Sequence, residues 1–390
     1  MSTTLAPPPP PTSTPPPLSS PSPVLVLADD SDVLGEGPVH DPRTGKLYRV
    51  DIEGKKVLSV DLKGAKKAGT EEGAAGEKTS SAVVGETPEP VGCLCLTSDP
   101  NLLLVALSRS VHSLDISTGK LSERALATLP EGEGVEGLRF NDGKASPRGT
   151  LVVGRLHSRW RDGLKGAVYA LGKKKGPGSS PSSSEWELER VLGPEEVGMG
   201  NGMAWRPKSR GGGGGENPEA AFDFFVVDSA AKTVQRFATD PSTAAPVSGT
   251  GEVVLDASDL GGAVPDGMDV DADGMLWVAL AETGTVACFD PDAKRKGLPL
   301  ARRATLRLPL TRVTSCAFGA RMRGGSEGEG EDFSSSLFVT SREEASKLKE
   351  EASPVAGAVL VVSDVAGAAR ISSGGKKVSA GCPLPAVVEL

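Results

Sequence analysis

The sequence predicts an all-β protein, a single six-bladed β-propeller with low-complexity loop insertions and a disordered N-terminal tail. Three observations support this prediction. A pair of short strands rich in Val, Leu, Tyr or Phe occurs six times along the chain. The copies recur roughly every 40 to 65 residues, an interval typical of propeller blades. Almost no stretch of the chain shows helical periodicity, whereas the strand pairs alternate with period two.

The six strand pairs follow one another in order along the chain. They begin at Gly45 (GKLYRVDIEGKKVLSVD), Asn101, Gly149, Asp223, Gly274 and Ser335. Each pair is separated by a few polar or glycine residues, as in an antiparallel hairpin. In a propeller the innermost strand of each blade lines the central axis. Polar side chains just before or at the start of these strands are therefore expected to converge.

Low-complexity segments interrupt the repeat. Residues 1–23 are rich in Pro, Ser and Thr and are expected to form a disordered tail, with the propeller over residues 24–390. Four internal segments are expected to be surface insertions, because their composition cannot bury apolar surface. They are residues 63–81, 172–185, 207–221 and 321–336. A fifth segment, residues 342–354, is compatible with one short helix.

Composition limits the classes of partner and the compartment. The formal net charge of −8 argues against general binding to nucleic acid or to a membrane surface. No apolar run is long enough to span a bilayer. The five cysteines include no C-x-x-C pair, so a reducing compartment is favoured. The N-terminal stretch has neither basic residues nor an apolar segment, and a cytoplasmic location is expected.

Three segments that precede apolar strand starts hold an oxygen-bearing side chain followed by glycine. The residues are Glu36 in GEGPVHDP, Asn201 in MGNGMAWRP and Asp266 in VPDGMDVDADG. Two carboxylates and one amide form a hard-oxygen set that suits Ca²⁺, Mg²⁺ or Mn²⁺ and can accept Zn²⁺. Three protein ligands would leave positions for water and substrate. The flanking glycines would allow close approach of backbone and ligand.

Taken singly, each of these motifs is also a common turn. Asp-Gly and Asn-Gly are frequent turn dipeptides, and only equivalent positions in a repeat favour a shared site. A fourth segment, LRFNDGKASPRGT, carries Arg139 and Asn141, which face the same side if the segment is a strand. There they would bind a substrate. The alternative is that NDGK forms a type I′ turn with a solvated lysine.

The motifs together resemble the SMP-30/gluconolactonase/luciferin-regenerating-enzyme family. GEGPVHDPRTGKLYRVDI, RFNDGKASPRG, GNGMAWRP, FFVVDS, PDGMDVDADGMLWVAL and LPLTRVTSCAFG occur in the family's order, from about residue 24 to 365. The resemblance implies a six-bladed propeller and hydrolysis of sugar lactones. It implies one divalent metal ion, Ca²⁺ or Zn²⁺ with Mg²⁺ or Mn²⁺ also possible. The implied metal ligands are Glu36, Asn201 and Asp266, and the implied lactone contacts are Arg139 and Asn141. Asp228 matches a further inner acidic position.

The chain also departs from the family pattern. His40 stands where a tryptophan is usual, and Ser146 replaces an aspartate. Many members have an acidic residue after the third-blade strand, where this chain has Arg155, His157 and Ser158. The three implied metal ligands are all present, but residues expected to surround the substrate differ from the family pattern. The resemblance therefore leaves the identity of the lactone open.

The chemistry expected from these residues is opening of a lactone by metal-activated water. Asp266 is the expected metal ligand that also accepts the proton. No G-x-S-x-G motif occurs, in agreement with hydrolysis without a covalent nucleophile. Two alternatives remain: a non-catalytic propeller that binds calcium or a partner, and a hydrolase acting on a non-sugar lactone, an ester or a phosphotriester.

Overall fold

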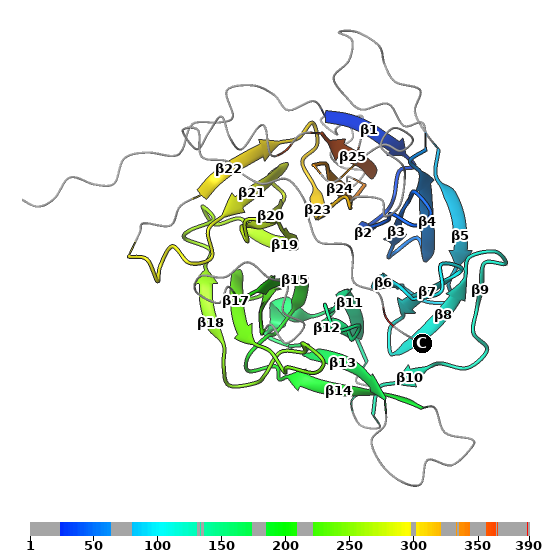
Figure 1. Cartoon of the computed structure of the whole chain (residues 1–390), viewed down its shortest axis with the longest axis horizontal. Coiled ribbons are helices and arrows are strands. Elements are labelled where there is room, and N and C mark those ends of the chain that lie inside the picture. The colour runs from blue at the N-terminus through cyan, green and yellow to red at the C-terminus, as the bar shows by residue number, and fades with distance from the viewer. Residues whose placement is uncertain are drawn as a thin grey trace, which may run out of the picture.

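The computed structural model is a ring of six antiparallel sheets around a central axis (Figure 1). The all-β, six-bladed prediction is therefore confirmed. The structure describes residues 24–63, 80–130, 133, 136–173, 185–208, 221–297, 302–320, 333, 335–343, 356–363, 365 and 388. The predicted tail, most of the insertions and the helix expected over residues 342–354 lie outside these residues, apart from a few positions at their ends. In the described part, no helix is long and apolar enough to cross a membrane.

Each blade is built in the same way, with its first strand innermost. Blade 1 holds β2 (Gly35–Asp41), β3 (Lys46–Asp51), β4 (Lys56–Asp61) and β5 (Ala82–Glu86). Blade 2 holds β6 (Cys93–Leu96), β7 (Leu102–Ala106), β8 (Ser110–Asp115), the short β9 (Lys120–Leu121) and β10 (Ala127–Thr128). Blade 3 holds β11 (Leu138–Ala145), β12 (Leu151–His157), β13 (Val168–Lys173) and β14 (Trp186–Leu192).

The second half of the ring repeats this order. Blade 4 holds β15 (Gly200–Pro207), β16 (Phe222–Asp228), β17 (Thr233–Ala238) and β18 (Glu252–Leu255). Blade 5 holds β19 (Val264–Val270), β20 (Leu276–Ala281), β21 (Thr285–Phe289) and β22 (Arg302–Arg307). Blade 6 holds β23 (Val313–Phe318), β24 (Leu337–Ser341), β25 (Ala358–Val362) and β1 (Val24–Asp29). The strand pairs expected from the sequence are the second and third strands of each blade.

The N-terminal strand β1 closes the ring by completing the last blade. β1 pairs with β25, from Val24 opposite Val362 to Asp29 opposite Ala358. The first strand of the described chain thus completes the last blade, and both ends of the ring are held by one ladder. The sequence-based hairpin count did not include this strand, because a lone strand that pairs more than 300 residues away leaves no local pattern.

Apolar side chains fill the six spaces between neighbouring blades. Six buried clusters occur in the described residues, and each draws its members from two adjacent blades. Val, Leu and Ala dominate them, as the low aromatic content predicts. Cys93 and Cys95 lie as small buried residues in the cluster between blades 2 and 3. Because the blades wedge against one another, the inner strands hold fixed positions around the axis.

One residue near the C-terminus docks on an inner strand. The Val388 N–H donates to Leu96 O at 3.0 Å, and Val388 O accepts from Ser98 N–H at 3.0 Å. Its side chain is 1% exposed and packs in the cluster between blades 2 and 3. The contact extends the sheet of blade 2 by one parallel bridge to Thr97.

We expect Val388→Asp to lower the free energy of unfolding by about 2–4 kcal/mol, since it places an unpaired carboxylate in an apolar site. Urea unfolding followed by circular dichroism measures the change. Val253→Asp is the matched control, because Val253 is 42% exposed on the outer strand β18. Equal stability of the Val388 variant and the wild type would show that the docked residue contributes nothing.

Candidate functional site

The inner strands carry the predicted site residues at β-bulges. A bulge sets two residues of one strand opposite a single residue of its partner. The register shifts in this way in five of the six inner strands of the described chain. Asn201 and Asp266 are each the first residue of a bulged pair, and Glu36 directly precedes one. The extra residue breaks the ladder and re-aims the neighbouring side chains toward the axis.

The other blades place different residues at this level. Asn141 is the first bulged residue of β11, and Thr314 holds the same position in β23. The Thr314 hydroxyl donates to Gly35 O of blade 1 and so links blades 6 and 1. Strand β6 has no bulge, and Val91, which precedes it, is fully buried. The bulges at this level of the ring, which we call the hub, therefore come from blades 1, 3, 4, 5 and 6, whereas Val91 packs between blades 1 and 2.

The glycines beside the site residues admit neighbouring backbone. A Cβ atom on Gly202 would lie 2.3 Å from Met268 N, and one on Gly267 would lie 2.4 Å from Ser315 Cα. Each glycine therefore lets the next blade approach the inner strand. At these two positions glycine serves the packing of the hub. A Cβ atom on Gly37, beside Glu36, would meet no atom within 4 Å, and there the interpretation that glycine leaves room for a ligand stays a prediction.

A chain of hydrogen bonds fixes the amide groups of the site. Asn141 Nδ2 donates to Asn201 Oδ1 at 2.8 Å and to Gly200 O at 3.2 Å. Asn201 Nδ2 donates to Ser229 Oγ at 2.9 Å, and the Ser229 hydroxyl donates to Pro265 O at 2.7 Å. The Asn201 side chain is thus oriented with its carbonyl oxygen toward Asn141. That oxygen has a second lone pair with which it can bind a cation.

Arg139 joins the same network. Its Nη1 donates to Asn141 Oδ1 and to Phe140 O, both at 2.9 Å. Arg139 and Asn141 therefore share one side of β11, as expected for a strand. Burial lowers the pKa of Arg139, and the negative charges of Glu36, Glu53 and Asp266 oppose that shift. The structure thus brings the predicted substrate residues together with the predicted metal ligands.

The carboxyl groups at the hub have raised pKa values. Burial, together with the negative charges of Asp266 and Asp142, raises the pKa of Glu36 well above its ordinary range. Burial and the charge of Asp142 raise the pKa of Asp266 to about 8, against weaker lowering by Arg342 and Arg139. Burial raises the pKa of Asp142 to about 6, although Lys144 opposes the shift. The nearby positive charges do not balance these carboxylates.

This donor set fits a divalent cation. Two carboxylates whose charge is unfavourable in the metal-free protein and one oriented amide oxygen are hard ligands of the kind that Ca²⁺ and Mg²⁺ take. Across the described residues, no three His, Cys, Asp or Glu side chains are grouped closely enough to hold a metal ion. A cation at the hub would therefore need the amide oxygen of Asn201 in addition to Glu36 and Asp266.

The segment that carries Asn141 is a strand and not a turn. Residues 138–145 form β11, and Gly143 and Lys144 pair with Val153 and Val152. The Lys144 ammonium contacts Asp269 Oδ1 at 2.5 Å, and Asp269 Oδ2 accepts from Phe318 N–H at 2.8 Å. The alternative of a type I′ turn with a solvated lysine is wrong. This lysine instead links blade 3 with blades 5 and 6.

Ser229, Asp142 and Thr314 belong to the hub but were not predicted from the sequence. Ser229 follows Asp228 in VVDS at the end of β16, on the site face. Asp228 itself accepts backbone N–H groups from residues 198, 199, 230 and 231. It holds the loops on either side of Asn201 and Ser229. A search of residues that follow the second strand of each blade, as well as those that precede the first, would have found Ser229.

Two of the departures from the family pattern have structural roles. His40 packs against Phe333 and Phe338, its Nδ1 accepts from Ala320 N–H at 2.9 Å, and burial lowers its pKa to about 4. His40 therefore packs as an aromatic core residue in the position where the family has tryptophan. The Ser146 hydroxyl donates to Thr243 O and accepts two backbone N–H groups, so it stabilises a turn.

Comparisons with known proteins identify the family and agree with the fold. Residues 34–324 match the family described as SMP-30/Gluconolactonase/LRE-like region. The chain belongs to this family. Regucalcin from Gallus gallus is 26% identical over 313 residues, which cover 79% of this chain and 83% of that protein. A Bacillus subtilis protein, provisionally named a sugar lactone lactonase, is 26% identical and covers 75% of this chain and 82% of its own length.

Solved structures confirm the propeller. A calcium-binding regucalcin from Agrobacterium tumefaciens matches with a TM-score of 0.62 at 24% identity, over 86% of this chain and 92% of that chain. A gluconolactonase from Xanthomonas campestris matches with a TM-score of 0.52 at 18% identity, over 87% and 89% of the two chains. At these identities the likeness establishes the fold, and the activity depends on the site.

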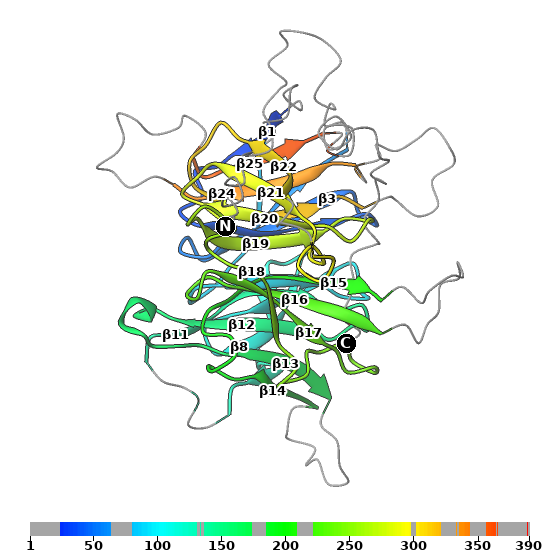
Figure 2. The same cartoon turned by 90° about the vertical axis from the view of Figure 1, so that its left-hand side faces the viewer.

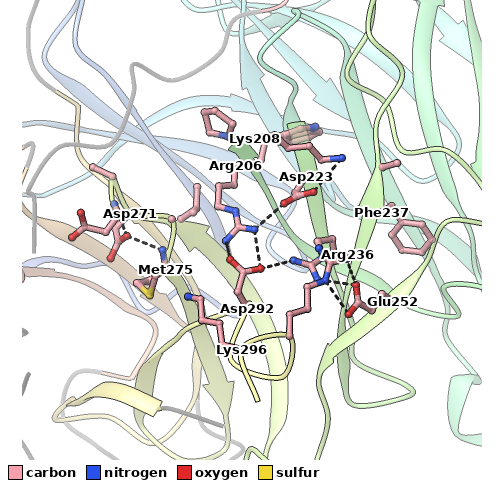
Figure 3. A pocket seen from close by; sticks show the side chains of 18 of the residues that line it. Arg206, Lys208, Asp223, Arg236, Phe237, Glu252, Asp271, Met275, Asp292 and Lys296 are labelled. Atoms are coloured by element: carbon pink, nitrogen blue, oxygen red, sulfur yellow. Dashed lines mark hydrogen bonds and ion pairs between the residues drawn. The ribbon is translucent and has the colours of Figure 1, made fainter. Parts of the chain in front are cut away.

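A large pocket lies away from the hub. It has a volume of about 1120 Å³ and lies between blades 4 and 5 (Figure 3). Its lining includes Arg206 at the end of β15, whereas Asn201 is at the start of that strand. The two sites therefore lie on opposite faces of the ring, about 16 Å apart along the strand. None of the predicted site residues lines this pocket.

The pocket is crossed by paired charges. Asp292 of blade 5 accepts from Arg206 at 2.8 Å and from Arg236 at 2.7 Å, both of blade 4. Arg236 also donates to Glu252 at 2.7 Å, and its side chain is only 3% exposed. Burial opposes the charge of Asp292, but the hydrogen bonds and charges of the two arginines outweigh it and lower its pKa to about 2. The network ties two neighbouring blades together.

Because the folded pKa of Asp292 is depressed, its contribution to stability is present above about pH 4 and lost as the pH falls toward 2. We expect Asp292→Asn to lower the free energy of unfolding by about 1–3 kcal/mol at pH 7, since it leaves the buried Arg236 short of a partner. The loss should be smaller at pH 3, which lies between the unfolded and folded pKa values. Urea unfolding at pH 7 and pH 3 measures both.

Asp162→Asn is the control, because its ion pair with Arg159 is 56% and 69% exposed and should contribute less than about 0.5 kcal/mol. A loss in the Asp292 variant that is the same at both pH values would contradict the assignment to its charge.

Proposed function

We propose that the protein is a divalent-metal-dependent hydrolase that opens a lactone ring, as the lactonases of its family do. One observation supports this most strongly. At the hub, Glu36, Asn201 and Asp266 from three blades lie in one electrostatic and hydrogen-bonded network with Arg139 and Asn141. A propeller that serves only as a scaffold has no need of carboxylates with raised pKa values at its centre.

The proposed reaction is hydrolysis of the ring ester. A divalent cation held by Glu36, Asn201 and Asp266 would polarise the lactone carbonyl and lower the pKa of water. Water adds to the carbonyl carbon, the bond from that carbon to the ring oxygen breaks, and a hydroxy acid forms. Asp266 accepts the proton from water and returns it to the departing ring oxygen. Arg139 donates hydrogen bonds that orient the substrate, and Asn141 accepts one from a substrate hydroxyl through the second lone pair of its Oδ1.

The supporting residues hold this arrangement in place. Ser229 fixes the amide of Asn201 through Nδ2 and leaves its oxygen for the cation. Such partners of ligating groups commonly affect metal affinity by ten- to a hundredfold.

In the described part, Cys93, Cys95, Cys288 and Cys316 are free and buried. This supports the proposal of a reducing compartment such as the cytoplasm.

A second candidate is a calcium-binding propeller without catalysis. The same hard-oxygen donors suit Ca²⁺, and the regucalcin from Agrobacterium tumefaciens is described as a calcium-binding protein. The two candidates differ in one measurable respect. Both predict metal binding that depends on Glu36 and Asp266, but only the hydrolase predicts turnover of a lactone.

We expect Glu36→Gln, Asn201→Ala and Asp266→Asn each to reduce kcat/KM for lactone hydrolysis by more than about a hundredfold, because each removes a donor on which the reaction depends. EDTA should abolish activity, and Ca²⁺, Zn²⁺, Mn²⁺ or Mg²⁺ should restore it. Lactone hydrolysis by pH-stat measures activity, and calorimetry measures metal binding in the same variants.

Glu123→Gln, a substitution in a loop of blade 2, is the control and should retain full activity. Full activity in any of the three hub variants would remove the proposed site. Metal binding that is lost in those variants, without hydrolysis of any lactone by the wild type, would favour the calcium-binding alternative.

The raised pKa of Asp266, about 8, predicts that metal binding depends on pH. Below pH 8 a cation must displace a proton from this carboxyl group, so affinity should rise about tenfold per pH unit between pH 6 and 8 and level off above. Calorimetry in buffers of different ionisation enthalpy should show release of about one proton or more at pH 7. Affinity that does not change between pH 6 and 9 would contradict this assignment.

A further inference from the structure

The substrate wall beside Arg139 is formed by the neighbouring strand of blade 3. Arg139 of β11 is directly opposite Leu156 of β12 in the antiparallel ladder. Residues that face each other across such a ladder point to the same side of the sheet. Leu156 therefore lies on the same side as the Arg139 side chain, and it is only partly buried. An apolar side chain thus adjoins the residue proposed to orient the substrate.

The polar residues on either side of Leu156 point away from this wall. Arg155 is 2% exposed, and it donates to Tyr169 Oη at 2.9 Å and to Glu133 O at 2.8 Å. His157 is 7% exposed, and its Nδ1 accepts the backbone N–H of Arg159 at 3.0 Å. Because strand residues alternate in direction, neither reaches the side occupied by Leu156. The polar groups at these positions are therefore committed to internal contacts.

The loop after β12 carries cationic donors, Arg159, Arg161 and Lys165, but a single carboxylate. It contains the 3-10 helix η1 (Trp160–Asp162), which projects from one face of the ring beside β11 (Figure 2). Its single carboxylate, Asp162, pairs with Arg159 at 2.9 Å, and both side chains are exposed. Leu164, later in the same loop, is 39% exposed. The carboxylates that act on Arg139 come from blades 1 and 5.

On β12, the side chain that shares the side of Arg139 is therefore the apolar Leu156. We propose that Leu156 determines specificity, and that the preferred substrate is a lactone whose ring carries an apolar alkyl substituent. The ester group would face the hub, and the substituent would lie on Leu156. A polyhydroxylated sugar lactone would place hydroxyl groups against a side chain that cannot pair with them. This inference rests on the proposed lactone hydrolysis and specifies its substrate class.

A series of δ-lactones with alkyl substituents of increasing length tests the proposal. We expect kcat/KM for the metal-loaded protein to rise about two- to fourfold per methylene over the first few carbons, as each is buried on the wall. Glucono-δ-lactone should be at least tenfold poorer than the best alkyl lactone. A flat or falling series, with glucono-δ-lactone preferred, would overturn the proposal and leave the proposed hydrolase function intact.

Two substitutions at Leu156 separate its role from that of the hub. Leu156→Ala should flatten the dependence of kcat/KM on chain length, so that each added methylene changes kcat/KM by less than about 1.5-fold. Leu156→Glu, which places a carboxylate opposite Arg139, should reverse the preference by at least tenfold toward glucono-δ-lactone. Val253→Ala, an exposed position on β18, should change neither. An unchanged chain-length dependence in Leu156→Ala would show that the substituent lies elsewhere.

A binding measurement keeps the test independent of turnover. The matching alkyl δ-lactams resist hydrolysis, and their affinity for the metal-loaded protein should rise with chain length by the same factor per methylene. Calorimetry on the wild type and Leu156→Ala measures this. Loss of the trend in the variant supports the proposal. Hydrolysis of no lactone would overturn the proposed function and with it this inference, whereas lactam binding without a chain-length trend would overturn only the inference.

Discussion

Closure of the ring is the constraint on which the rest of the structure depends. One ladder between β1 and β25 holds the first and last strands of the propeller together. Six apolar clusters then lock each blade against its neighbours, so the inner strands cannot spread apart. Glu36 and Asp266 are 230 positions apart in the sequence, and only this enclosure brings them close together. At that separation the negative charge of Asp266 raises the pKa of Glu36. The chemistry at the hub is a consequence of that closure.

Closure alone would leave the inner strands with regular pleats, and their side chains would alternate between the two faces of each blade. The bulges change this at the level of the site. At Asn201 and Asp266 the extra residue interrupts the ladder. The glycine that follows each of them, Gly202 or Gly267, is in close contact with the inner strand of the next blade. A site built in this way is rigid, because moving one donor would require repacking two blades. Such rigidity suits a group that must hold a cation and a substrate at fixed positions.

The sequence predicted the propeller because strand pairs of period two repeat at blade-like intervals, which is a local signal. It could not predict β1, whose partner is at the other end of the chain. Glu36, Asn201 and Asp266 could be predicted as ligands because their motifs hold equivalent positions in the repeat. Ser229 was missed because its role depends on a contact with Asn201 that only the packed blade creates. The role of Leu156 likewise depends on ladder register, which the insertions and bulges conceal in the sequence.

The directions of the pKa shifts distinguish the two faces of the ring. At the pocket between blades 4 and 5, Asp292 has two arginines within hydrogen-bonding distance, and its pKa falls to about 2. That carboxylate is satisfied by the protein itself, and its charge stabilises the fold. At the hub, Glu36 and Asp266 keep their charge only at a cost, because Arg139 and Arg342 do not offset burial and mutual repulsion. A folded protein gains nothing in stability from such a pair. A positive group that binds from outside would offset this cost, and this is the physical reason for proposing a metal site, and with it the lactonase reaction, on this face.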